Sequence, residues 1–170
     1  MAEVDLSRVP AFYHGYIGKV PQNNLNEAFV YHEKALLSLL DTIAETKWDH
    51  RYAQGKWSIR ETVQHIIDAE RIFCYRALCF ARGDKTELPG FDENAYAASS
   101  RADKRISQSL KEELRSVQQS SMLLFGSFDE EQLNASGVAN KNSIYVKGIG
   151  FIIVGHALHH KSILEERYLK

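Results

Sequence analysis

Residues 58–82, SIRETVQHIIDAERIFCYRALCFAR, decide the fold because they are typical of one long helix. Ser58 with Glu61 three positions later forms a capping box, in which each side chain satisfies a free backbone amide at the helix start. Apolar residues then recur three and four positions apart and form one buried stripe. The stripe consists of Ile59, Val63, Ile66, Phe73, Ala77 and Phe80. Gly83 is expected to end the helix.

Three more segments show the same periodicity, over about residues 24–46, 102–125 and 147–168. Asn24 with Glu27 marks the start of the first. No stretch of sustained two-residue alternation requires a sheet. We therefore predict an all-α fold, a four-helix bundle. The last two links run to about twenty residues each, which permits long crossover connections in place of a simple up-and-down order.

The size and charge of the chain limit its organisation and its partners. With 170 residues, 44 % of them hydrophobic, it has the usual length of one domain. We expect a single bundle domain over residues 24–170, with residues 1–23 packing on it as an N-terminal segment. The net charge of −1 offers no basic surface, so neither nucleic acid nor a membrane is an expected partner.

The termini and the cysteines favour a cytoplasmic location. Glu3, Asp5 and Arg8 stand where a signal peptide would need a basic stretch and an apolar block. The longest apolar stretches are too short to cross a bilayer. Cys74 and Cys79 lie five positions apart on the expected helix and point away from each other, so they cannot form a disulfide together.

Residues 155–160, GHALHH, carry the clearest chemical signal. His156 and His160 are four apart on the apolar face of the last helix, from which two imidazoles can converge on one cation. Hydrogen bonding across the core is the alternative. His65 lies at the edge of the stripe of helix 58–82 and can add a third neutral nitrogen. Zinc and similar ions accept this set and keep a position open for water or substrate.

Asp68 and Glu70 follow His65 on the same helix. Either carboxylate is a candidate catalytic group, as a general base or as a group that orients a metal ligand. Asp68 has an alternative as an exposed residue paired with Arg71 or Arg76. Glu70 falls on the buried stripe, where a carboxylate rarely lacks a partner.

The remaining histidines and the glycines of the last helix have simpler interpretations. His159 is rotated about 100° from the pair, which favours an interhelical hydrogen bond or contact with a ligand. His32 lies on the stripe of the first helix and is expected to be a hydrogen-bonded core residue. Gly148, Gly150 and Gly155 are expected to allow close approach of a neighbouring segment, or to leave space beside the metal.

Together, these motifs resemble the DinB/YfiT-like superfamily. The resemblance rests on KWSIRE (56–61), QHIIDAER (64–71), LPGFDEN (88–94), GHALHH (155–160) and LEERY (164–168), which span most of the chain from about residue 25. It implies a bundle with crossed connections, a homodimer, and a nickel or zinc ion held by His65, His156 and His160. Members with known activities tend to be thiol S-transferases or isomerases that use a low-molecular-weight thiol, and some are suggested hydrolases.

We therefore expect an enzyme in which a metal ion held by three histidines activates a small thiol or water. Candidate wall residues of its pocket are Tyr75, Arg76, Asp92 and Tyr96. A metal-dependent hydrolase is one alternative. A metal-binding or interaction protein without turnover is another, and a metal-free histidine cluster is a third.

Overall fold

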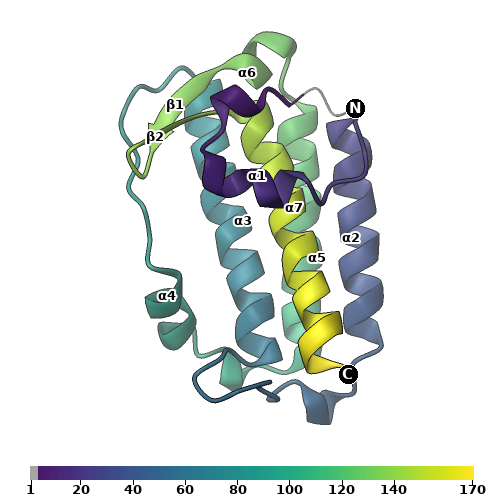
Figure 1. The fold of residues 1–170 in the computed structure, drawn as a ribbon. Coiled ribbons are helices and arrows are strands. Elements are labelled where there is room, and N and C mark those ends of the chain that lie inside the picture. Colours follow the sequence, from purple (N-terminus) through teal and green to yellow (C-terminus); the bar gives the residue numbers. More distant parts are fainter. Residues whose placement is uncertain (1–3) are drawn as a thin grey trace.

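The computed structural model describes residues 4–170 and consists of four long helices with shorter elements around them (Figure 1). The long helices are α2 (Leu25–Asp41), α3 (Ile59–Ala81), α5 (Ser107–Gly126) and α7 (Val146–Ile163). The predicted all-α four-helix bundle is thereby confirmed. Among the described residues, no helix combines the length and the apolar composition that a membrane span requires.

The predicted helix starts are formed by the expected side chains. Asn24 accepts hydrogen bonds from the amides of Asn26 and Glu27, and Ser58 and Glu61 form the complete capping box of α3. Gly83, with a φ of +77°, follows the end of α3. Such a left-handed residue satisfies the last carbonyl groups of a helix, which is why glycine is favoured there.

Two predicted helix boundaries were wrong. The first helix ends at Asp41 and not near residue 46, because Glu45–Lys47 form a separate 3-10 turn. The third begins at Ser107 and not near residue 102, because Arg101 takes a left-handed conformation and Ala102–Lys104 form another 3-10 turn. The last helix continues beyond α7 as one π-helical turn, Leu164–Tyr168.

The shorter elements are α1 (His14–Ile17), α4 (Glu93–Ser99), α6 (Glu130–Asn134) and a hairpin of β1 (Ser136–Ala139) and β2 (Asn142–Tyr145). The hairpin was not predicted, because its strands of four residues are too short for a clear alternation. The strands pair antiparallel, with Ala139 opposite Asn142. Asn140 and Lys141 form the tight turn with positive φ values of 50° and 62°.

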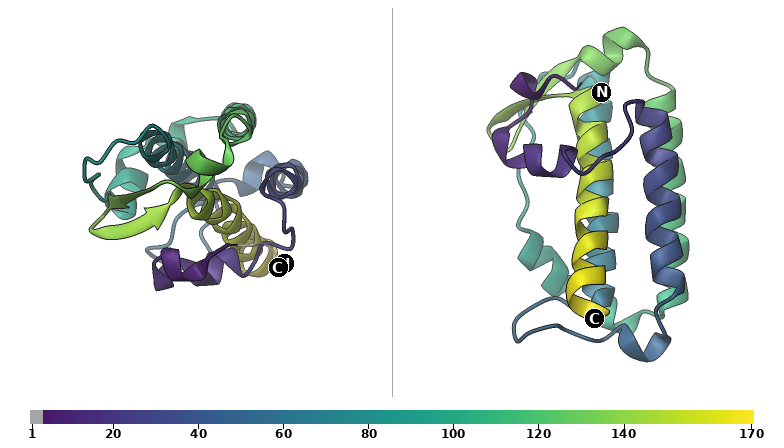
Figure 2. Two further views of the ribbon diagram at one scale, coloured as in Figure 1. Left: turned by 90° about the horizontal axis from the view of Figure 1, so that it is seen from above. Right: turned by 45° about the vertical axis from the view of Figure 1, so that its right-hand side comes forward.

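The connections cross the bundle, as the link lengths allowed. Helices α3 and α5 run in the same direction. The segment 82–106, which includes α4, therefore runs back along the length of the bundle from the end of α3 to the start of α5 (Figures 1 and 2). Helix α7 packs between α2 and α3, and α5 packs against the same two helices from the other side. Therefore α2 and α3 occupy diagonal corners.

The apolar core is divided into two clusters by a layer of polar side chains. One cluster includes Phe29 and Phe73, and the other includes Leu36 and Ile67. Between them lie His32 of α2, Glu70 of α3 and Gln118 of α5, all buried. The His32 Nε2 and Glu70 Oε2 atoms are 4.0 Å apart. None of the three side chains has a hydrogen-bond partner within residues 4–170.

Candidate metal centre

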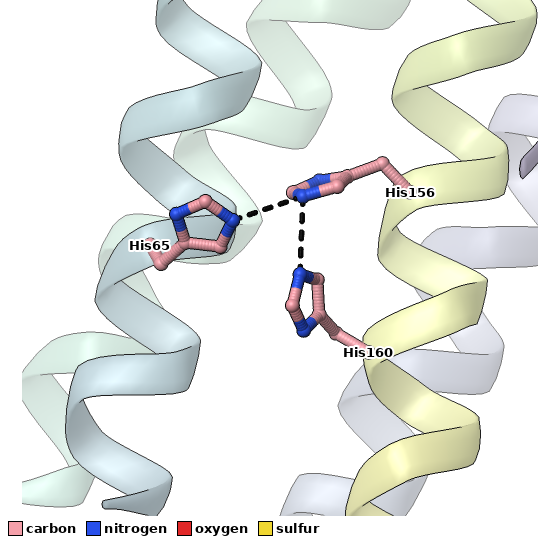
Figure 3. Close-up of side chains that lie close together, drawn as sticks. All are labelled: His65, His156 and His160. Carbon is pink, nitrogen blue, oxygen red and sulfur yellow. Dashed lines mark hydrogen bonds between the residues drawn. The ribbon is translucent and has the colours of Figure 1, made fainter. Parts of the chain in front are cut away.

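Two neighbouring helices bring three histidines together (Figure 3). His65 comes from α3, and His156 and His160 come from successive turns of α7. Helices α3 and α7 pack side by side. His65, at the edge of the apolar stripe of α3, therefore faces His156 and His160 on α7. All three side chains are buried, with exposed fractions of 8 %, 6 % and 9 % in sequence order. The predicted convergence of these residues is therefore present.

The ring nitrogens of the three histidines meet at one point. The Nε2 atom of His156 lies 3.0 Å from that of His65 and 3.1 Å from that of His160. One nitrogen from each residue lies within 4.8 Å of the other two. Two nitrogens bound to one tetrahedral ion at about 2.0–2.1 Å are about 3.3 Å apart. The spacing therefore fits a shared metal ion.

Hydrogen bonding alone cannot satisfy this arrangement. A neutral ring nitrogen has either one proton to donate or one lone pair to accept with. The Nε2 atom of His156 faces two other Nε2 atoms, so it can form a full hydrogen bond with only one of them. A cation at the meeting point would accept all three lone pairs together, and the donor set fits a metal for this reason.

The three histidines are held in the neutral form that metal binding requires. Burial lowers the pKa of His65 to about 4 and that of His160 to about 3. Burial also lowers the pKa of His156 well below its usual value, and the neighbouring histidines add to the effect. A buried imidazole loses the hydration of its charged form, which favours the neutral ring. Each ring therefore keeps one nitrogen with a free lone pair near neutral pH, and no second proton competes with a metal for it.

A cavity of about 350 Å³ lies beside the histidines. Its wall is mostly aromatic, with a few polar groups. The residues that line it are Phe12, Tyr13, Tyr16, Trp57, His65, Ala69, Phe73, Arg76, Gly90, Phe91, Glu93, Asn140, His156 and His160. Its size suits a small-molecule ligand.

The N-terminal segment forms one wall of this cavity. Tyr13 and Tyr16 line it, and the Tyr16 ring lies 5.5 Å from the ring of His156. A Cβ atom at position 155 would lie 2.1 Å from the Tyr16 carbonyl oxygen. Gly155 therefore lets α1 cross directly over α7. Of the two reasons expected for this glycine, the structure shows the close approach of a neighbouring segment. Burial raises the pKa of both tyrosine hydroxyls, which stay protonated.

The family model of the DinB superfamily matches residues 28–164. This range contains all four long helices apart from the first turn of α2, together with the three histidines. The chain belongs to the DinB superfamily. Among curated proteins, no sequence matches it.

This DinB-superfamily chain is also similar to a solved structure. The structure is described as "YfiT from Bacillus subtilis is a probable metal-dependent hydrolase with an unusual four-helix bundle topology". The two chains share 18 % sequence identity with a TM-score of 0.69, and the match covers 91 % of this chain and 84 % of the other. At this identity the likeness concerns the fold, including its crossed helix order.

Neither predicted catalytic carboxylate of the DinB chain lies in the cavity. Glu70 points to the centre of the bundle, where its Oε2 atom lies 4.0 Å from the Nε2 atom of His32. Asp68 accepts a hydrogen bond of 2.9 Å from Gln64, and burial raises its pKa. Five residues after His65, Glu70 is rotated by about 140° on the helix. Neither carboxylate therefore faces the three histidines across the cavity.

The other predicted residues are distributed over several places. His159 packs its ring 5.1 Å from that of Tyr16 and is half-buried. His32 is buried without a hydrogen bond in the described chain, so the expectation that it is a hydrogen-bonded core residue was wrong. Of the predicted wall residues, Arg76 alone lines the cavity. Asp92 instead caps α4, and Tyr75 and Tyr96 are exposed.

Several lining residues were missed by sequence reasoning. Tyr13 and Tyr16 lie in a segment without a helical stripe, and Asn140 lies in the turn of the unpredicted hairpin. Trp57 precedes the capping box of α3, and its ring lies 4.7 Å from that of His65. The position of Trp57 next to Ser58 was the one signal that could have indicated its role. Ser58 starts the helix about two turns before His65, so a side chain at this helix start lies near the site.

Proposed function

We propose that this protein is a metal-dependent enzyme in which His65, His156 and His160 hold a divalent ion at the cavity. The observation that carries the proposal is the meeting of three neutral ring nitrogens, 3.0 and 3.1 Å apart, at the wall of a 350 Å³ cavity. Three protein ligands leave at least one coordination position for another molecule. Structural zinc sites are usually closed by a fourth protein ligand, whereas catalytic sites are open.

A bound ion would supply Lewis acidity, which makes a thiolate or hydroxide available near neutral pH. The chain's own residues determine what reaches it. Tyr16 packs edge-on to His156, and Trp57 packs against His65, so both ligand rings are restricted in orientation. The same aromatic rings line the cavity and exclude bulk water from one side of the ligands. A small organic molecule therefore gains apolar contacts there.

We propose a low-molecular-weight thiol as the nucleophile, which makes the protein an S-transferase. Glu93 is the one carboxylate among the described residues that line the cavity, and it is exposed. Hydrolysis benefits from a buried general base that takes a proton from water. A thiol coordinated to a metal ion loses its proton outright and needs no such base. Sulfur would attack an electrophilic carbon as the leaving group departs with its electron pair.

Hydrolysis is the second candidate, and two observations favour it. The similar solved structure is described as a probable metal-dependent hydrolase. Glu93 is also close enough to His65 to oppose the lowering of its pKa by burial, so its carboxylate acts within the same cavity. In this candidate Glu93 takes the proton from the attacking water. The substrate would then be an ester or an amide, and water would replace the thiol as the nucleophile.

Metal content is the first prediction. Elemental analysis of the purified protein should find about one divalent ion per chain, for which we propose nickel or zinc because both accept imidazole ligands. His65→Ala and His156→Ala should each lose the ion. His50→Ala is the matched control, since His50 is exposed and lies outside the cluster. Retention of the ion by both ligand variants would refute the site.

Activity is tested on the metal-loaded protein with a panel of thiols and electrophiles, alongside ester and amide substrates. We expect thiol transfer that disappears on chelation and returns when metal is added back. Glu93→Gln separates the two candidates, because it should leave thiol transfer largely unchanged but slow hydrolysis roughly a hundredfold or more. Metal binding without turnover of either class would leave a non-catalytic metal protein.

A further inference from the structure

Arg76 is a buried cation at the wall of the cavity. It lies on α3 with an exposed fraction of 5 %. Eleven residues separate it from His65, about three turns of the helix, so both side chains leave α3 on nearly the same face. Ala69 and Phe73 occupy the two turns between them and line the same cavity. The cavity therefore extends along α3 from the histidines to Arg76.

The guanidinium group of Arg76 is only partly hydrogen-bonded. Its Nη2 donates to the carbonyl oxygen of Pro89 at 2.8 Å, and Arg76 also acts on the Tyr13 hydroxyl, whose pKa it lowers against the larger effect of burial. A guanidinium has five N–H donors, so donors remain for another molecule. Within residues 4–170, no carboxylate oxygen lies within 4.0 Å of it. Burial of a charge without an opposite charge is unfavourable. Glu93, the one carboxylate among the described residues that line the cavity, is exposed and does not pair with Arg76. This cation therefore has no carboxylate partner within the described chain.

The chain's other buried arginine shows the usual solution. Arg60, with an exposed fraction of 7 %, donates to Glu45 at 2.7 Å and to Asp49 at 2.9 Å. Its positive charge is thus balanced by two carboxylates of the chain. Arg76 is equally buried and faces a cavity, but no carboxylate of the described chain pairs with it. The comparison indicates that the counter-charge for Arg76 comes from outside the chain.

The surroundings of Arg76 set the kind of molecule that fits. The Phe73 ring lies 5.7 Å from its guanidinium carbon and 6.3 Å from the ring of His156. One aromatic ring therefore spans the distance between the cation and the histidines. Arg76 is also the one lysine or arginine among the described residues that line the cavity. Its single positive charge matches a monoanion better than a doubly charged phosphate.

We propose that Arg76 binds the carboxylate of a small molecule whose other end reaches the three histidines. The planar guanidinium fork pairs with the two oxygens of a carboxylate through parallel hydrogen bonds. The anion site stands on Arg76 and the cavity. That the bound molecule is the substrate rests on the proposed function. The substrate class is then a carboxylic acid with an apolar body, which carries its reacting group at the end away from the carboxylate.

Binding of benzoate to the purified protein tests this proposal, with benzyl alcohol and phenyl phosphate as comparison ligands. Trp57 lines the cavity, and its fluorescence reports occupancy, while Trp48 is buried in the core. We expect benzoate to bind more tightly than benzyl alcohol. Arg76→Gln should weaken benzoate roughly tenfold to a hundredfold, the usual effect of losing hydrogen bonds to a charged group. Arg76→Lys should fall between, because it keeps the charge but loses the fork.

Arg71→Gln is the matched control, since Arg71 lies on the same helix, is exposed and pairs with Glu113. It should bind benzoate as the wild type does. If Arg76→Gln fails to fold, the Nε–H resonance of Arg76 in the wild-type protein replaces it, and saturating benzoate should shift that signal. An unshifted signal, equal binding of benzyl alcohol, or tighter binding of phenyl phosphate would each overturn the carboxylate assignment.

The same titration after chelation separates this proposal from the proposed function. Benzoate held by Arg76 should still bind to metal-free protein. If chelation abolishes binding and Arg76→Gln retains it, the carboxylate binds the metal and the Arg76 proposal fails. If the purified protein contains no metal but binds benzoate through Arg76, the metal-dependent function fails and the anion site stands.

Discussion

The imidazoles of His65, His156 and His160 differ from exposed histidines in that burial keeps them neutral. An exposed histidine has a pKa of 6.5, whereas burial lowers that of His65 to about 4 and that of His160 to about 3. Between these values the unfolded chain binds protons that the folded chain does not. Stability that depends on these groups is therefore full above pH 6.5 and falls as the pH drops toward 4.

We predict that acidification destabilises the metal-free protein through these histidines. Lowering the pH from about 7 to about 5 should cost on the order of 2 kcal/mol of unfolding free energy for a histidine whose pKa falls from 6.5 to about 4, as that of His65 does. Urea denaturation of the chelated protein at both pH values measures this loss. His65→Gln should show a smaller loss because it has one proton-binding site fewer. His50→Ala should behave as the wild type, and an equal pH dependence in His65→Gln would contradict the assignment.

At the scale of elements, the contact between α1 and α7 closes the cavity. Gly155 has no side chain, so the backbone at Tyr16 lies directly on α7. The segment that supplies this contact also supplies Tyr13 and Tyr16 to the cavity wall. Packing of the N-terminal segment and formation of the site therefore depend on the same glycine.

We predict that Gly155→Ala displaces α1 and opens the cavity. The new Cβ would meet the backbone of Tyr16, which cannot move aside as a flexible side chain can, so we expect a loss of about 1–3 kcal/mol of stability. Gly126→Ala is the matched control, because nothing lies within 4 Å of a Cβ atom at the end of α5. Thermal unfolding measures the stability of both variants, and proteolysis at the N-terminal segment should accelerate in Gly155→Ala alone. Equal behaviour of the two variants would contradict the contact.

At the scale of the whole molecule, a polar layer interrupts the core. His32 and Glu70 meet across the diagonal of the bundle, where α2 and α3 face each other, and the His32 Nε2 and Glu70 Oε2 atoms are 4.0 Å apart. This distance is too long for a hydrogen bond. Polar groups buried without partners destabilise a fold, and replacing both members of a buried polar pair by apolar side chains of similar size is often neutral or stabilising.

We predict that the double variant His32→Leu/Glu70→Leu is more stable than the wild type by about 1–4 kcal/mol. Each single variant should be less stable than the double variant, because it leaves one buried polar group behind without its neighbour. Urea denaturation of the four proteins gives the coupling between the two positions. Metal content should not change, since neither residue lines the cavity. A double variant less stable than the wild type would show that the polar layer is satisfied by bound molecules.

Much of the fold could be predicted because local patterns determine it. The capping side chains at Asn24 and Ser58 and the apolar stripes locate α2 and α3 without reference to the rest of the chain. The hairpin could not be predicted, because its strands are short and Ala139 and Leu88 meet through a parallel bridge between distant segments. Sequence periodicity does not report contacts of this kind.

Local patterns in the chain were sufficient to predict the four helices, their buried faces and the inward direction of His65, His156 and His160. Helical geometry is local, so the position of a residue in the chain fixes the face on which it lies. Which residues share the site depends instead on how the helices pack against each other. Helix α7 packs beside α3, which brings its two histidines to His65. In the same packing, Glu70 faces His32 of α2 across the centre of the bundle. Arg76 lines the cavity without a carboxylate partner. The distance between helices depends on long-range packing, which the order of residues along one helix does not contain.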